Sequence, residues 1–264
     1  MKNYQYIKIA LQDAFAWVEI NRPEQKNAMH PAMMLELQEA FKLLGTNTAI
    51  RAICLRGNGA AFCAGADLHW MKSAANQSFE QNKNESLLLA QTFQIINDCP
   101  VPVIAQIHGA AMGGANGLIA ACDFAFCTND TVFAFSEVKL GIIPATIAPF
   151  VIKKIGVSAA TELMITGKRF NGNKAEKLGL VNESLATINE VENAVTSVLK
   201  ELTTAAPNAV KACKQLIRQV AFEWNSSNML ENTANAIATI RTTSEAQEGM
   251  NAFFNKTKPS WHEQ

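Results

Sequence analysis

The chain has 264 residues, 48% of them hydrophobic, so one large domain with a sizeable buried core is expected. Lys and Arg together number 23, and so do Asp and Glu, which leaves a formal net charge of zero. A balanced chain offers no electrostatic reason to expect nucleic acid or an anionic membrane as a partner, and neither is predicted.

The first part of the chain predicts a β-hairpin followed by a helix. Residues 6–11 alternate in polarity and residues 14–20 are rich in aromatic and β-branched side chains, a pattern typical of paired strands. Pro31 begins a helix. The apolar stripe of this helix consists of Met34, Leu37, Phe41 and Leu44. A buried strand is expected at 52–55, and a further helix near Asp67, whose carboxylate would cap it.

The middle of the chain is the most apolar part. From Cys99 to Cys122 there is no charged residue, a length that could cross a bilayer. The prolines and glycines within it favour a strand at 103–107, a loop at 109–114 and a buried helix at 114–121 instead. Strands are also expected at 124–127 and 131–135. A helix at 87–96 precedes this stretch.

From Leu202 onward the pattern is helical and polar-amphipathic, without a convincing strand. We therefore predict an α/β core over residues 1–200 and a helical region over residues 201–264. Lys211, Lys214 and Arg218 are spaced for one helix face, and we interpret them as a solvated surface.

The cysteines and histidines do not predict a metal site. The six cysteines form no C-x-x-C pair, and no two histidines have H-x-x-x-H spacing. Most cysteines lie in apolar stretches, as expected for reduced, buried thiols of a cytoplasmic protein. Cys63 lacks a basic neighbour that would activate it and is interpreted as a packing residue.

Two segments of small residues carry the functional signal. Residues 61–68 and 107–117 each surround the predicted start of a helix, where backbone N–H groups lack a partner and small side chains let a ligand approach. Two such ends facing each other could bind one oxygen atom from two sides, which is the definition of an oxyanion hole. Neither segment matches the G-x-G-x-x-G or P-loop pattern, so a phosphate cradle is not predicted.

In this order and spacing the segments resemble the crotonase (enoyl-CoA hydratase/isomerase) superfamily over nearly the whole chain. The matching residues are Asn21-Arg22-Pro23 with Asn27-Ala28, Ala64 to Leu68, Pro102 to Gly117, Ala121-Cys122-Asp123, Ser136 to Pro144, Ala175 to Val181 and Glu248 to Phe254. The resemblance implies a spiral of ββα turns with a C-terminal helical trimerisation region, in a homotrimer or a dimer of trimers. It implies an acyl-CoA thioester as substrate and no separate cofactor.

The resemblance also assigns roles to residues. The backbone N–H groups of Ala66 and Gly114 would form the oxyanion hole for the thioester carbonyl. The residues implied in coenzyme A binding are Ala64, Asp67 and Leu68, Lys26 in the early loop, and Phe253 and Lys256, which match tail positions that reach a neighbouring subunit's ligand.

The family's hydratases use two glutamates, and this chain keeps one. Glu137 matches the glutamate that delivers a proton to C2, and its apolar flanks should raise its pKa. Gly117 stands where the other, water-activating glutamate would be. The segments 117–123 and 136–151 resemble a bacterial group assigned to 3-methylglutaconyl-CoA hydratase of leucine degradation. In that case Glu137 itself, or polar groups such as Asn116, Ser136 or Thr146, would hold the water.

The sequence leaves three functions open. Hydration of a 2-enoyl-CoA is the first. Δ3,Δ2-enoyl-CoA isomerisation is the second, because one carboxylate suffices to move a proton between C4 and C2. The third is a CoA-binding or RNA-binding protein with little catalysis. The zero net charge and the lack of a basic-plus-aromatic pattern disfavour RNA. From bare sequence, Glu137 could also be a surface residue paired with Lys139.

Overall fold

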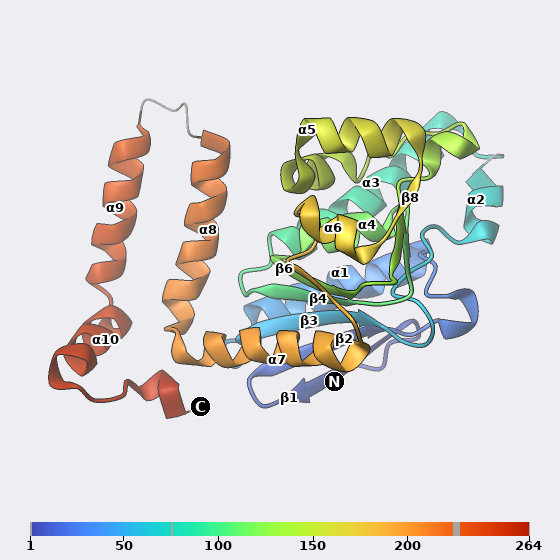
Figure 1. The fold of residues 1–264 in the computed structure, drawn as a ribbon. Helices are drawn as coiled ribbons and strands as arrows, with labels where there is room; N and C mark the ends of the chain where they lie inside the picture. The colour runs from blue at the N-terminus through green and yellow to red at the C-terminus, as the bar shows by residue number, and fades with distance from the viewer. Residues whose placement is uncertain (1, 75, 224–227, 264) are drawn as a thin grey trace.

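The computed structural model describes residues 2–74, 76–223 and 228–263 and shows a mixed α/β fold, as predicted (Figure 1). The strands are β1 Ile7–Gln12, β2 Phe15–Ile20, β3 Ala52–Gly57, β4 Val103–Ile107, β5 Ala110–Met112, β6 Phe124–Thr128, β7 Val132–Ala134, β8 Arg169–Phe170 and β9 Glu183–Leu185. The α-helices are α1 Pro31–Thr46, α2 Leu68–Ala74, α3 Phe79–Asn97, α4 Ala115–Ala121, α5 Ala148–Thr166, α6 Gly172–Lys177, α7 Ile188–Thr204, α8 Pro207–Glu223, α9 Met229–Arg241 and α10 Ser244–Asn255. Short 3₁₀ helices are η1 Pro23–Gln25, η2 Glu137–Leu140 and η3 Ser260–Glu263.

The strands form two sheets that the chain visits in turn. The six-stranded sheet has the order β1-β2-β3-β4-β6-β9, and the three-stranded sheet has the order β5-β7-β8. The chain runs β4, β5, α4 and then β6, β7, α5. Each turn therefore adds one strand to each sheet, and a helix follows the two strands. The strands added in this way are parallel to the previous ones. This repetition is the predicted spiral of ββα turns.

The local predictions hold in the first half of the chain, with one exception at 109–114. The hairpin is present, with β1 antiparallel to β2. The four apolar residues of the predicted stripe on α1 are buried. The predicted loop at 109–114 is wrong in part, because residues 110–112 form β5, which pairs with β7. Its sequence, Ala-Ala-Met, has no β-branched residue, and the neighbouring strand supplies the order instead.

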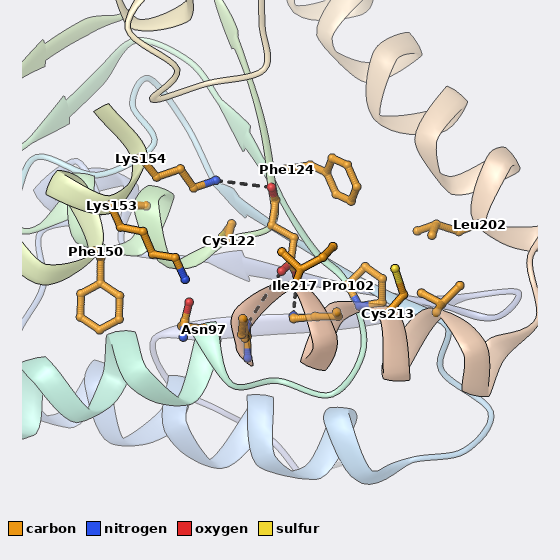
Figure 2. Close-up of a pocket in the computed structure, with 15 residues that line it drawn as sticks. Asn97, Pro102, Cys122, Phe124, Phe150, Lys153, Lys154, Leu202, Cys213 and Ile217 are labelled. Atoms are coloured by element: carbon orange, nitrogen blue, oxygen red, sulfur yellow. Dashed lines mark hydrogen bonds and ion pairs between the residues drawn. The ribbon is translucent and has the colours of Figure 1, made fainter. Parts of the chain in front are cut away.

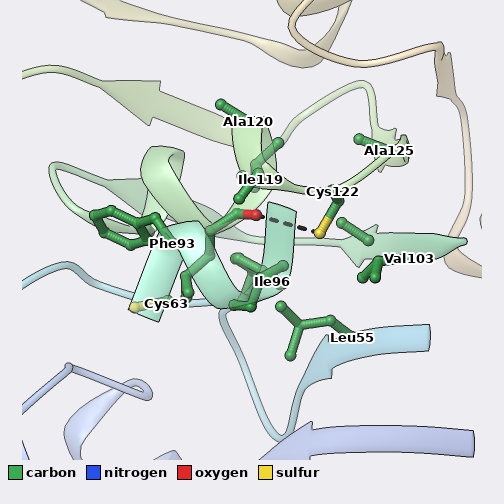
Figure 3. Packing of buried hydrophobic residues seen from close by; sticks show 14 of the residues in the cluster. Leu55, Cys63, Phe93, Ile96, Val103, Ile119, Ala120, Cys122 and Ala125 are labelled. Carbon is green, nitrogen blue, oxygen red and sulfur yellow. Dashed lines mark hydrogen bonds between the residues drawn. The ribbon is translucent and has the colours of Figure 1, made fainter. Parts of the chain in front are cut away.

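The core lies between the six-stranded sheet and helices α1, α3 and α4. Phe93 and Ile96 of α3 pack with Leu55 of β3, Val103 of β4 and Ile119 of α4 (Figure 3). Cysteines fill small gaps in the protein, and Cys54, Cys63, Cys99, Cys122 and Cys127 are buried, whereas Cys213 is exposed. Burial raises the pKa of the Cys63 thiol to about 12, so it is a packing residue and no nucleophile at neutral pH.

Helix α7 covers the other face of the sheet, and α8 to α10 extend away from it (Figure 1). Val191, Val195 and Leu199 of α7 pack on β4 and β6. The predicted boundary between residues 200 and 201 falls inside α7, and the extended helices begin at α8. Among the described residues no helix is long and apolar enough to cross a membrane.

The interpretation of Lys214 and Arg218 as a solvated surface is wrong. Lys214 is 8% exposed, and its Nζ donates to Asp123 Oδ2 at 2.5 Å and to the Val101 carbonyl at 2.9 Å. Arg218 pairs with Asp98 at 3.4 Å and with Asp123 at 3.8 Å. These side chains join α8 to the core beside a cavity of about 470 Å³ (Figure 2). Helical spacing alone could not reveal Asp123, which lies some ninety residues away.

Candidate active site

Two isolated parallel bridges bring the small-residue segments together. Cys63 pairs with Ala111, through hydrogen bonds from Cys63 N to Ala110 O at 3.0 Å and from Met112 N to Cys63 O at 3.1 Å. Met29 pairs with Ala66, since Met29 N donates to Gly65 O at 2.7 Å and Asp67 N donates to Met29 O at 2.8 Å. The first segment is thereby held between β5 and Met29, which lies two residues before the start of α1.

The N–H groups of Ala66 and Gly114 make no hydrogen bond within the described part of the chain. Both residues contact Met29, which bridges to Ala66 and whose Cε lies 2.6 Å from where a Cβ on Gly114 would be. Gly65, at φ +94°, has no room for a side chain, because a Cβ there would lie 2.8 Å from Met112 O. Two unpaired donors from two adjoining segments are what an oxyanion hole requires.

Glu137 lies at the edge of the same turn. Its Oε1 is 3.2 Å from where a Cβ on Gly113 would be, and Gly113 directly precedes Gly114. Its Oε2 is buried without a hydrogen-bond partner among the described residues. Burial raises the pKa of the Glu137 carboxyl above its ordinary value. The ion pair with Lys139 considered from sequence is not found between these two described side chains.

The place of the missing glutamate is occupied by hydrophobic side chains. A Cβ on Gly117 would lie 2.6 Å from Phe93 Cζ and 2.7 Å from Ile147 Cγ2, distances shorter than real Cβ contacts. Both side chains are almost fully buried. Position 117 therefore has no space for any side chain, and the missing carboxylate is replaced by an apolar wall.

Asn116 is buried and braces the turn that carries Gly114. Its Nδ2 donates to the carbonyls of Ala111 at 3.2 Å, Gly113 at 3.0 Å and Ala134 at 3.0 Å. Ala134 also accepts from Gly113 N at 2.9 Å and lies three residues before Glu137. The amide thus ties the Gly113-Gly114 turn to the strand that leads to Glu137, and its donors are not free to hold a water.

Replacing Asn116 by Leu, which has a similar size, should remove these three hydrogen bonds. Three buried carbonyls would lose a donor, so we expect the free energy of unfolding to fall by about 1–3 kcal/mol. Because the turn carries Gly114, we also expect kcat to fall by a larger factor than the factor by which KM rises. Denaturant unfolding and steady-state kinetics measure the two effects. An unchanged kcat in a folded Leu variant would show that these hydrogen bonds stabilise the fold without contributing to catalysis.

Asp67 serves structural roles at the start of α2. Its Oδ2 accepts from Arg22 Nη2 at 2.9 Å, and its Oδ1 accepts from His69 N at 2.8 Å and Trp70 N at 3.3 Å. Burial opposes the ionised form, but the Arg22 and backbone hydrogen bonds outweigh it and lower the pKa of Asp67. The predicted N-cap is confirmed, and the carboxylate is already paired before any ligand binds.

The other residues implied in coenzyme A binding fall into two groups. Lys26 adjoins Ala64, whose N–H donates to Lys26 O at 2.9 Å, and Leu68 is 72% exposed at the start of α2. Phe253, 79% exposed, and Lys256 lie at the end of α10, on the opposite side of the molecule from α2 (Figure 1). The first group lies with the site, whereas the second lies too far away to join it within one chain.

Comparisons with known proteins agree with this geometry. Residues 11–264 match the model of the enoyl-CoA hydratase/isomerase family. The chain belongs to that family. Its crotonase fold is shared with a solved enoyl-CoA hydratase from Shewanella pealeana, 34% identical at a TM-score of 0.93, with 97% of this chain and 96% of that chain covered.

Other relatives of this crotonase-family enzyme have different reaction names. A solved enoyl-CoA hydratase/isomerase from Marinobacter aquaeolei is 32% identical, with a TM-score of 0.92 and coverage of 97% and 99%. The peroxisomal Δ(3,5)-Δ(2,4)-dienoyl-CoA isomerase of Arabidopsis thaliana is 31% identical, with 89% and 93% covered. The chain is accordingly an enoyl-CoA hydratase or isomerase. In its described part no cluster of residues could hold a metal ion.

Proposed function

We propose that this enzyme adds water to a 2-enoyl-CoA. The N–H groups of Ala66 and Gly114 would bind the thioester oxygen, and Glu137 would deliver the proton to C2. The observation that carries the proposal is the position of the Glu137 carboxyl beside Gly113, next to two backbone donors without a partner.

The chemistry follows from the charge that develops during addition. When water oxygen attacks C3, electrons move to the thioester oxygen and form an enolate. Two fixed N–H donors stabilise that charge without reorganisation, an effect worth about 2.7–4 kcal/mol per donor in other enzymes. Glu137, whose pKa is raised by burial, would then give a proton to C2 as the carbonyl re-forms.

Coenzyme A binding would combine both groups of predicted residues. Ala64 and Leu68 would line the path of the ligand, Lys26 would contact it from the early loop, and Asp67 would shape the path through its cap on α2. Phe253 and Lys256 would contact the ligand of a neighbouring subunit, which fits their exposure far from their own site. This arrangement requires the predicted homotrimer or dimer of trimers.

The substrate we propose is 3-methylglutaconyl-CoA, within leucine degradation in the cytoplasm. It is supported by the resemblance of residues 117–123 and 136–151 to the bacterial group with that activity. Two features separate this chain from hydratases with two glutamates. One is the glycine at 117, and the other is the stretch from Pro144 to Pro149, which stands in place of the family's glycine-rich run.

A second candidate is Δ3,Δ2-enoyl-CoA isomerisation. It is favoured by the lack of room at position 117 for a second carboxylate, because this reaction needs only one. Glu137 alone would take a proton from C2 of the 3-enoyl thioester and return one to C4.

Turnover in ¹⁸O-labelled water separates the two reactions. The purified protein would be incubated with 3-methylglutaconyl-CoA, crotonyl-CoA and a 3-enoyl-CoA, and the products analysed by mass spectrometry. We expect ¹⁸O in the product, formed fastest from 3-methylglutaconyl-CoA. An isomerised product without label would support the second candidate and overturn the first.

A further inference from the structure

Hydration of an enoyl thioester requires two proton movements. One group must accept a proton from the attacking water, and another must give a proton to C2. If Glu137 begins protonated and gives its proton to C2, the water needs a different base. The inference below rests on the proposed hydration and asks which group that base is.

The protein does not offer the base at the position where the family carries it. A side chain at 117 would overlap Phe93 and Ile147 at 2.6–2.7 Å. The other polar side chains that the sequence suggested for the water are not bases at neutral pH. Asn116 is an amide whose Nδ2 is shared among three carbonyls and whose Oδ1 is buried without a partner among the described residues, and Ser136 and Thr146 are hydroxyls. Asp67 is paired with Arg22 and caps α2.

We propose that the substrate supplies the base, and that this enzyme acts on 2-enoyl thioesters whose C3 carries a carboxymethyl group. The carboxylate of that group is one carbon removed from C3. A water held between the carboxylate oxygen and C3 closes a six-membered arrangement of C3, the CH₂, the carboxyl carbon and oxygen, the water proton and the water oxygen. The reacting groups therefore belong to one molecule, which gives the high effective concentration of an intramolecular base.

The atoms and electrons balance in two steps. The water oxygen forms a bond to C3, the C2–C3 π electrons move to the thioester oxygen, and the water proton passes to the substrate carboxylate. Glu137 then protonates C2. Proton exchange through solvent returns the substrate carboxyl to its ionised form and Glu137 to its protonated form. The net change is the addition of one water, with no oxidant, metal or further reactant.

A carboxylate on the substrate avoids the obstruction at position 117. Phe93 and Ile147 are 0% and 1% exposed and exclude a protein side chain there, so the base has to come with the ligand.

The test compares two substrates of nearly equal shape on the wild-type enzyme. One is 3-methylglutaconyl-CoA, and the other is its analogue with a neutral carboxamide in place of the distal carboxylate. Hydration is followed by ¹⁸O incorporation. We expect kcat for the carboxamide to be lower by about 10²–10⁴-fold, the usual contribution of a general base, with a much smaller change in KM.

Each outcome is decisive. Equal kcat values with label incorporated into both products would overturn the substrate base and leave the proposed hydration standing. A change confined to KM would mean that the carboxylate only aids binding, and would overturn the inference too. Absence of label from both products would overturn the hydration itself.

A variant gives an independent check. Phe93→Ala combined with Gly117→Glu supplies a protein carboxylate and removes one of the two side chains that block it, which leaves Ile147 to shift into the space of the lost ring. If the inference is right, the folded double variant hydrates the neutral carboxamide faster than wild type does, and Phe93→Ala alone, the matched control, does not. If the folded double variant hydrates the carboxamide no faster than wild type does, the lack of a base is not the reason why that substrate reacts slowly, and the inference is wrong.

Discussion

Glu137→Gln is expected to lower kcat by about 10²–10⁴-fold, the usual contribution of a general acid–base group. Gln keeps the size of the side chain and removes only the exchangeable carboxyl proton. Because Glu137 Oε2 has no partner in the described structure, the substitution breaks no hydrogen bond of that atom. Affinity for coenzyme A thioesters, measured by calorimetry, and the free energy of unfolding should therefore change little.

A matched control separates this effect from a general loss of charge. Glu80, on α3, is exposed and forms only a surface pair with Lys83 at 3.4 Å. Glu80→Gln should leave kcat unchanged, because this carboxylate is 67% exposed on the surface of α3. It should also barely change stability, since such pairs contribute about 0–1 kcal/mol. If Glu137→Gln keeps the turnover of wild type, the catalytic assignment of Glu137 is wrong.

The pH dependence of kcat provides a second observation on the same group. Burial raises the pKa of Glu137, so its protonated, proton-donating form persists to higher pH than that of an ordinary glutamate. Hydration should be fast below this raised pKa and should decline as the pH rises through it. The Gln variant should lose this decline along with most of its turnover. If kcat declines at the same pH in both proteins, the decline belongs to another group.

Gly117→Glu is expected to destabilise the fold by more than about 4 kcal/mol and to abolish turnover rather than to create a two-glutamate hydratase. Overpacking of a tight core costs about 1–3 kcal/mol, and burial of an unpaired carboxylate adds a further penalty. Phe93 and Ile147 stand within 2.7 Å of the new Cβ, and neither lies at a surface into which it could move.

The physical cause can be checked by removing the obstructing ring. Phe93→Ala alone should cost about 3–5 kcal/mol through the cavity it leaves. Combined with Gly117→Glu it should cost less than the sum of the two single changes, since the new side chain occupies that cavity. Denaturant unfolding of the four proteins forms a double-mutant cycle, and strict additivity would contradict the contact.

Local patterns predicted much of the fold and the two segments that adjoin at the candidate site. Alternation gave the hairpin, helical spacing gave the buried stripe of α1, and small residues at helix starts marked the segments that hold Ala66 and Gly114. These features depend on neighbours in the chain. The apolar flanks of Glu137 likewise predicted its raised pKa.

Contacts between distant residues were not predictable in this way. The wall at Gly117 joins Phe93 on α3 to Ile147 before α5, and each alone looks like an ordinary core residue. Lys214 looks solvated until Asp123 is placed beside it. The role of Asn116 depends on Ala134, which β7 brings next to the turn. In each case a partner that is distant in the sequence determines the role of the residue.

The most direct test of the account is a crystal structure of the protein with a bound acyl-CoA thioester. We predict that the thioester oxygen accepts hydrogen bonds from the N–H groups of both Ala66 and Gly114 at about 2.7–3.1 Å, with the Glu137 carboxyl beside C2. A thioester oxygen bound elsewhere, with these two donors unengaged, would contradict the oxyanion hole on which the proposed function depends.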